Sequence, residues 1–140
     1  GICNVYTTNI LFKLGIPMSV YIVTKSEKWL KRAILPMALD EREIDESTLT
    51  MVRSSFCHVR VKAGMPSNVS AAEMRKYSSP TLLIAGEKDI LFPGERVIAR
   101  AKTIMPNLKT HLMEGCGHMS MLSSDKHKRI IKMIADFLEE

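Results

Sequence analysis

The sequence predicts an α/β fold in which parallel strands alternate with helices. Residues 81–85 form a near-continuous apolar run, typical of a strand that helices bury on both faces. A second strand-like run covers residues 109–114. Between the two runs, apolar residues recur with helical spacing over residues 94–105. A strand, a helix and a second strand in this order imply a right-handed crossover between parallel strands.

The chain before the first of these strands is predicted to be mainly helical. An apolar stretch covers residues 9–23, but Lys13 and Pro17 interrupt it. The stretch is therefore too short and too broken to cross a membrane.

Capping and turn residues divide this first part into separate helices. Ser26 can cap a helix that ends near Pro36. Residues 40–45 are expected to form an exposed acidic linker, and helical spacing resumes over residues 49–59. A short helix over residues 71–77 then leads to the first strand.

The elements of the second part have clear start and stop residues. Pro80 precedes the first strand, where its missing N–H is tolerated, and Gly86 lets the backbone turn out of the sheet. Pro106 ends the middle helix. A last helix is predicted over residues 124–138, with Ser124 as a candidate N-cap.

Both predicted strands are followed by a titratable side chain. Asp89 lies three residues after Gly86, and His118 lies in the glycine-rich turn that follows the second strand. In open α/β sheets, ligands bind beyond the carboxyl ends of the strands. We therefore expect the carboxylate and the imidazole to meet there. Glu87 is the rival acid, and Asp89 could instead simply form the turn.

Two segments carry a resemblance to a known family. PTLLIAGEKDILFP, residues 80–93, and GCGHM, residues 115–119, resemble the C-terminal half of the α/β-hydrolase fold. In that family an acid after one strand and a histidine after the last strand form two-thirds of a catalytic triad. The resemblance implies that His118 is the general base and that Asp89 orients it.

The third member of the triad has no counterpart in the sequence. The chain contains no G-x-S-x-G motif, and it begins with Gly1 rather than Met. The family order of nucleophile, acid and histidine places the nucleophile upstream. We therefore expect the C-terminal portion of a hydrolase, lacking the nucleophile elbow and the oxyanion hole. By the same resemblance, residues 1–79 are a helical cap and residues 80–140 the strand–helix–strand–helix part of the core.

The resemblance implies a serine hydrolase, esterase-like or lipase-like, that cleaves small-molecule carboxylic esters or related acyl bonds. This chain alone is expected to be inactive. An upstream Asp nucleophile would instead give a dehalogenase or an epoxide hydrolase, with Tyr6, Tyr21 or Tyr77 as candidate acids for epoxide opening. A truncated, non-catalytic protein with a binding or structural role is a third alternative. Its exposed sheet edge could support a homodimer.

Composition bounds the partners and the compartment. The chain is 46% hydrophobic and 25% charged, with a net charge of +5, as in ordinary globular proteins. Its basic residues fall on the polar faces of predicted helices without interleaved aromatic residues, so no nucleic-acid partner is expected. Three cysteines without framework spacing favour a reducing compartment, and we expect a cytoplasmic protein.

Cysteine and histidine residues raise two further hypotheses. Cys116 and His118 could form a nucleophile pair, but residues this close on one loop cannot readily face each other. A metal site from these two residues with Cys57 and His58 lacks the usual ligand spacing. The sequence therefore predicts neither a metal nor an organic cofactor, and Cys116 is expected to be a small residue in a tight loop.

Overall fold

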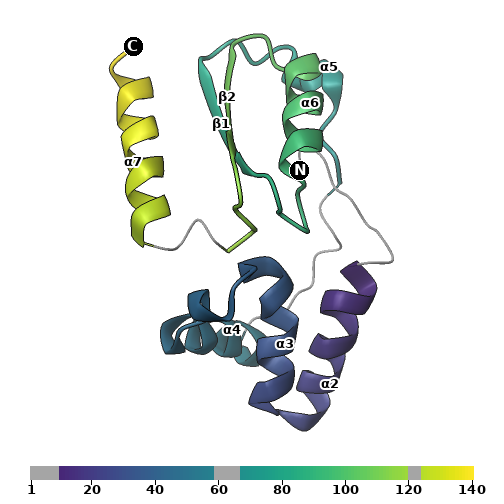
Figure 1. Cartoon of the computed structure of the whole chain (residues 1–140). Helices are drawn as coiled ribbons and strands as arrows, with labels where there is room; N and C mark the ends of the chain where they lie inside the picture. Colours follow the sequence, from purple (N-terminus) through teal and green to yellow (C-terminus); the bar gives the residue numbers. More distant parts are fainter. Residues whose placement is uncertain (1–9, 59–66, 120–123) are drawn as a thin grey trace. The chain divides into compact units, whose positions relative to one another are not determined.

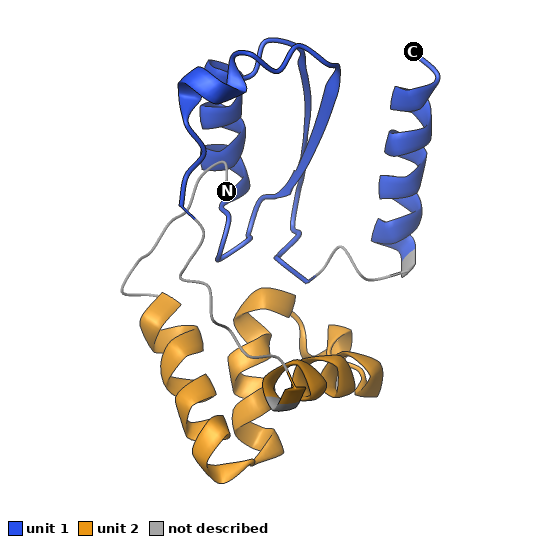
Figure 2. Ribbon diagram, turned by 180° about the vertical axis from the view of Figure 1, so that it is seen from behind, with its two compact units in different colours: residues 1–5, 66–140 blue, residues 6–65 orange. Residues whose placement is uncertain are grey.

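The computed structural model describes residues 10–58, 67–119 and 124–140. The chain divides into two compact units, one of residues 6–65 and one of residues 1–5 and 66–140 (Figure 2). Each unit has buried residues of its own. The functional division into a cap and a core at residue 80 stays a prediction.

The second unit contains the predicted parallel sheet. Strands β1 (Thr81–Gly86) and β2 (Leu108–Met113) pair in parallel along their whole length, with Gly86 opposite Met113. The two strands therefore end level at the same edge of the sheet. This confirms the α/β fold class, and each strand boundary lies within one residue of its prediction.

Helix α6 (Gly94–Ile104) connects the two strands and packs against both of them (Figure 1). Its buried face, Val97, Ala101 and Ile104, is the apolar stripe that the sequence predicted. The short helix α5 (Ala71–Met74) packs on α6, and Met74 contributes to the same core. Helix α7 (Ser124–Leu138) contacts β1, and Figures 1 and 2 show it across the strands from α6.

The first unit is helical, as predicted. Its elements are the π-helical turn η1 (Leu11–Gly15), helices α2 (Ile16–Thr24) and α3 (Glu27–Ala38), the 3-10 turn η2 (Glu41–Glu43) and helix α4 (Glu46–His58). The core residues below 4% exposure are Tyr21, Leu30, Ala33, Ile34, Ala38 and Leu49. None of the helices in the described ranges is both long and apolar enough to cross a membrane.

Helix α3 starts where it was predicted, after Ser26, and ends two residues beyond Pro36. The helix continues past Pro36 to Ala38 and stops where Leu39 adopts a left-handed conformation with φ 73°. The Leu39 N–H then donates to the Leu35 carbonyl at 2.8 Å, which satisfies a terminal acceptor. Ser26 occupies the N-cap position, but its hydroxyl makes no capping hydrogen bond. Proline lacks the N–H that would bind the carbonyl four residues earlier, and the helix ends two residues after Pro36.

The structure also differs from three other expectations. The acidic stretch forms η2, which begins where the Asp40 carboxylate accepts a hydrogen bond from the Arg42 backbone N–H at 2.9 Å. The helix predicted over residues 71–77 ends at Met74 and passes into a turn. Ser124 is the first residue of α7 rather than the residue before it. Tyr6 lies outside the described residues.

Candidate active site

The loops that follow β1 and β2 lie against each other. The Glu87 N–H donates to the Met113 carbonyl at 3.0 Å, and the Lys88 N–H donates to the Cys116 carbonyl at 2.9 Å. A Cβ atom at Gly86 would lie 2.6 Å from the Cys116 carbonyl oxygen. The close approach of the two loops therefore requires glycine at the end of β1.

Asp89 is fixed in place by the backbone of its own loop. The residue is 7% exposed. Its Oδ1 accepts hydrogen bonds from the backbone N–H groups of Leu91 at 2.8 Å and Phe92 at 2.9 Å. These local bonds form an Asx-type turn, which holds the other carboxylate oxygen in one direction.

That second oxygen meets His118. The distance between Asp89 Oδ2 and His118 Nδ1 is 2.9 Å. The geometric prediction that the two strand ends bring these side chains together is therefore confirmed, while their catalytic role stays a prediction. The His118 side chain is 36% exposed, and no described residue forms a hydrogen bond with its Nε2.

Charge determines which nitrogen of His118 carries the proton. An ionised carboxylate can only accept hydrogen bonds, so His118 Nδ1 donates to Asp89. In the neutral ring Nε2 then carries the lone pair that can accept a proton. Chemically, this arrangement allows His118 Nε2 to accept a proton while Asp89 keeps the proton on Nδ1.

The pair also shifts the ionisation of both groups. Burial is the largest single influence on Asp89 and raises its pKa, but the hydrogen bonds from His118, Phe92 and Leu91, together with the charge of His118, outweigh it. The pKa of Asp89 therefore lies below 3.8. For His118 the hydrogen bond with Asp89 is the largest influence. It raises the pKa above 6.5, against partial burial, which lowers it.

The rival acid Glu87 contacts a different residue of the histidine loop. Its Oε2 accepts a hydrogen bond from the Gly115 N–H at 2.8 Å. Cys116 is 2% exposed and unpaired, and it packs inside the tight loop. The other described histidines lie elsewhere: His58 ends α4, His111 is in β2 and His127 is exposed on α7.

Phe92 is a site residue that the sequence reasoning missed. Its backbone N–H binds Asp89, and its ring lies 5.8 Å from the His118 ring, centroid to centroid, at an angle of 41°. An Asp side chain that accepts hydrogen bonds from backbone N–H groups two or three residues later is a recognisable Asx-turn pattern. That pattern could have indicated the backbone contact, but not the contact between the rings.

The described residues hold no group of three or more His, Cys, Asp or Glu side chains arranged to bind a metal ion. Of the four residues considered for such a site, the side chain of Cys57 lies outside the description. Among the described residues, Asp89 and His118 meet as a pair.

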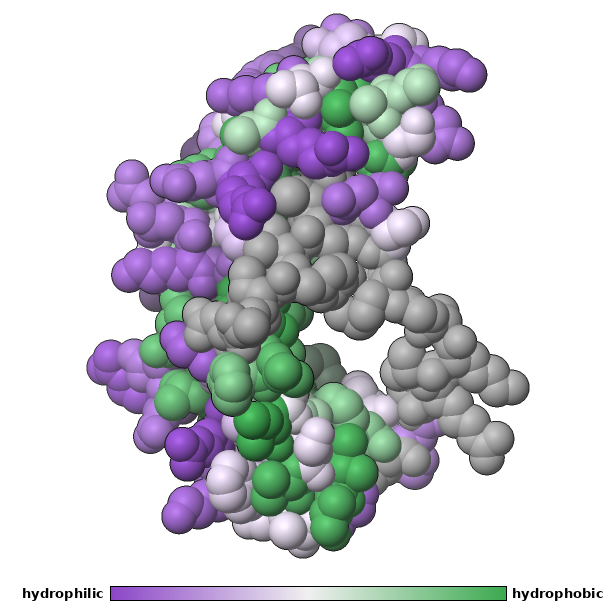
Figure 3. All heavy atoms as spheres, turned by 90° about the vertical axis from the view of Figure 1, so that its right-hand side faces the viewer, coloured by the Kyte–Doolittle hydropathy of each residue, from purple (hydrophilic) through white to green (hydrophobic). Residues whose placement is uncertain are grey.

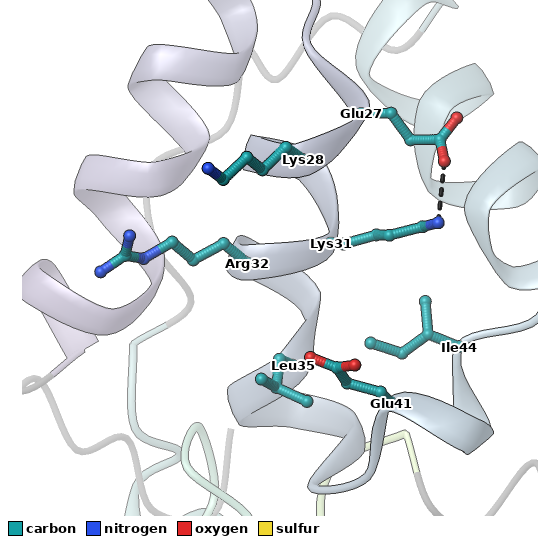
Figure 4. Close-up of a pocket in the computed structure, with 7 residues that line it drawn as sticks. All are labelled: Glu27, Lys28, Lys31, Arg32, Leu35, Glu41 and Ile44. Atoms are coloured by element: carbon teal, nitrogen blue, oxygen red, sulfur yellow. Dashed lines mark ion pairs between the residues drawn. The ribbon is translucent and has the colours of Figure 1, made fainter.

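A groove of about 590 Å³ lies wholly within the helical unit, on α3 and the turn that follows it. Its lining residues are Glu27, Lys28, Lys31, Arg32, Leu35, Glu41 and Ile44 (Figure 4). Lys31 forms an ion pair with Glu27 at 2.8 Å, and Figure 4 shows Lys28 and Arg32 pointing away from that pair. None of the lining residues belongs to the pair of Asp89 and His118.

The same unit exposes large apolar side chains. Figure 3 shows hydrophobic atoms gathered on one face of its helices. The most exposed apolar side chains of η1 and α2 are Leu11 at 58%, Phe12 at 64%, Ile22 at 50% and Val23 at 84%. Patches of this kind mark surfaces that contact another part of a protein or a partner.

No protein-family model and no curated protein sequence matches this chain. Two solved structures do. Naproxen esterase (carboxylesterase NP) from Bacillus subtilis superposes with a TM-score of 0.62 and 14% identity, over 84% of this chain and 45% of that one. A second Bacillus subtilis protein, to which hydrolase activity is attributed, superposes with a TM-score of 0.66 and 13% identity. The match covers 85% of this chain and 45% of that one.

The chain carries part of the α/β-hydrolase fold. It spans less than half the length of either structure, at 45% of each. In this fold, β1 and β2 are parallel core strands, and Asp89 and His118 lie beyond their carboxyl ends. Fold alone supports many chemistries, so the reaction has to be argued from the site.

Proposed function

We propose that the chain provides the acid and the base of an α/β hydrolase that cleaves carboxylic esters or related acyl bonds. The observation that supports this most directly is the 2.9 Å contact between Asp89 Oδ2 and His118 Nδ1. It supports the proposal because His118 Nε2 is left without a hydrogen-bond partner among the described residues, beyond the carboxyl ends of the strands, where open α/β sheets bind ligands. The serine nucleophile and the oxyanion hole would come from sequence preceding Gly1.

In this mechanism His118 Nε2 takes the proton from the serine hydroxyl as its oxygen attacks the acyl carbon. The imidazolium that forms is stabilised by Asp89, which also holds Nδ1 protonated throughout. The same Nε2 proton then passes to the departing alcohol oxygen as the bond to the acyl carbon breaks. Water repeats the sequence to release the acid and restore the serine.

The site suggests a specific consequence for Asp89→Asn. The Asn oxygen must accept from the Leu91 and Phe92 N–H groups, because an amide NH₂ cannot. The NH₂ group then faces His118 Nδ1 and donates to it, which puts the proton of the neutral ring on Nε2. That tautomer cannot act as the base, and similar changes reduce kcat by about four orders of magnitude.

The test is hydrolysis of a p-nitrophenyl ester by a longer protein that joins this chain to its upstream nucleophile segment. We expect Asp89→Asn and His118→Ala to lose about three to four orders of magnitude in kcat. His127→Ala is the matched control, because it removes an exposed histidine of α7, and it should retain full activity.

The substrate panel separates the reaction classes. Turnover of a haloalkane or an epoxide in place of the ester would replace the acyl mechanism with one that uses an Asp nucleophile. Ester turnover that survives His118→Ala would remove the proposed base. The 140-residue chain alone should give no turnover above background.

A further inference from the structure

We propose that Glu87 is a positioning residue for the pair of Asp89 and His118, because it holds the histidine loop against the acid loop. This inference rests on the proposed function, since the pair must be catalytic for its position to matter. It concerns the carboxylate that the triad itself does not use. Its contact, from Glu87 Oε2 to the Gly115 N–H at 2.8 Å, joins residues 28 positions apart.

Two carboxylates of one loop therefore bind two points of the other loop. Glu87 binds Gly115 at the start of the histidine turn, and Asp89 binds His118 three residues later. Gly115 has φ 64°, so the chain reverses direction at this residue. Glycine adopts positive and negative φ about equally readily, so its own conformational preference does not hold the chain in this turn.

Backbone bonds flank this turn and close it, since the Cys116 N–H donates to the Met113 carbonyl at 3.3 Å. The bonds between the loops join the Glu87 and Lys88 N–H groups to the Met113 and Cys116 carbonyls, on either side of the reversal, and none of these backbone bonds uses the Gly115 N–H. The bond from Glu87 is the side-chain contact that acts on the reversal itself. A small displacement of Gly115 moves His118 relative to Asp89, and catalysis is sensitive to such movements.

The test uses the 140-residue chain with isotope-labelled histidine and follows His118 by NMR, with His118→Ala assigning its signals. We expect Glu87→Ala to lower the pKa of His118 toward 6.5, because the contact with Asp89 that raises it is loosened. Exchange of the Nδ1 proton with water should also become faster. Glu87→Gln should leave both properties near their original values, since its amide oxygen still accepts from Gly115.

Glu114→Ala is the matched control. Glu114 is an exposed acid beside Gly115, and its side chain makes no hydrogen bond or ion pair with the described residues. Glu114→Ala removes the same negative charge from the residue next to Gly115. It should leave the pKa of His118 and the exchange of its Nδ1 proton unchanged. If Glu114→Ala lowers the pKa of His118 as much as Glu87→Ala does, the shift comes from the charge near the loop and not from the hydrogen bond to Gly115.

Asp89→Asn separates the two hypotheses. It should lower the pKa of His118 more than any change at Glu87. If Asp89→Asn has this effect but Glu87→Ala has none, Glu87 does not position the pair and the proposed function stands. If Asp89→Asn leaves the pKa unchanged, the pair itself is wrong.

A second measurement needs no variant and so does not depend on folding of a mutant. In the unmodified chain the Gly115 N–H should exchange with solvent about tenfold more slowly than that of an unstructured glycine. Exchange at the unstructured rate would show that the contact with Glu87 does not form in solution.

Discussion

At the scale of single residues, the site depends on how one buried carboxylate distributes its hydrogen bonds. Asp89 uses Oδ1 for two backbone N–H groups and Oδ2 for His118. The carboxylate is satisfied on both oxygens despite its burial, which is the condition under which a buried charge is tolerated. The backbone therefore orients the Asp89 carboxylate, and the carboxylate orients the His118 ring.

This arrangement predicts how stability depends on pH. The pKa of Asp89 is lowered in the folded state, so its contribution is present above 3.8 and is lost as the pH falls through the folded value. The pKa of His118 is raised, so its contribution is complete below 6.5 and is lost as the pH rises through the folded value. The pair should stabilise the chain most between these two limits.

Urea denaturation across this pH range checks the prediction. For the unmodified chain, the urea concentration at the midpoint of unfolding should be highest between the two limits and should decrease at lower and at higher pH. Asp89→Asn should flatten this dependence on pH. His127→Ala should keep the shape of the unmodified profile, because His127 is exposed. Parallel profiles for Asp89→Asn and the unmodified chain would show that the pair contributes nothing to folding.

At the scale of elements, the start of helix α6 is packed directly on the end of strand β1. A Cβ atom at Gly94 would lie 2.5 Å from the Gly86 carbonyl oxygen and 2.6 Å from a methyl group of Leu112. The first of these contacts is with backbone, which cannot move aside as a flexible side chain would. Glycine at this position lets the helix begin immediately beside the strand end that leads to Asp89.

We therefore expect Gly94→Ala to destabilise the chain. The added methyl must push α6 away from β1, and overpacking of this kind costs about 1–3 kcal/mol. The measurement is the free energy of unfolding in urea. Arg96→Ala changes an exposed side chain of the same helix and should stay within about 0.5 kcal/mol. A stability gain for Gly94→Ala, as helix propensity alone would give, would contradict the packing.

At the scale of the whole molecule, the described residues leave apolar surface and strand edges without partners. The sheet of the described ranges has two strands, so β1 and β2 each have one edge that pairs with no other described strand. Helix α7 exposes Ile131 at 53%, Ile134 at 42% and Leu138 at 76%. Surfaces of this kind favour association.

We expect the 140-residue chain to self-associate when it is expressed alone. Size-exclusion chromatography over a range of concentrations should show a dimer or larger species, and Ile131→Asp combined with Leu138→Asp should shift the distribution toward monomer. Lys128→Asp changes a charge on the same helix without removing apolar surface and serves as the control. A monodisperse monomer at all concentrations, with both strands strongly protected from hydrogen exchange, would contradict the expectation.

The sequence by itself determined the strands and the two residues of the pair. Residues 81–85 form a near-continuous apolar run, and this run together with the flanking Pro80 and Gly86 is typical of a strand that helices cover. Parallel strands end at one edge, so the positions of Asp89 and His118 followed from the strand ends alone. These inferences depend on local patterns, which a single sequence displays.

Tertiary structure decided which atoms touch. The contact of Glu87 with Gly115 spans 28 positions, and that of the Phe92 ring with His118 spans two separate loops. Neither contact follows from a local pattern, because each depends on the register of β1 against β2 and on the close approach at Gly86. The sequence shows which titratable side chains follow the strands, and the packing of the two loops determines which of the two acids reaches the histidine.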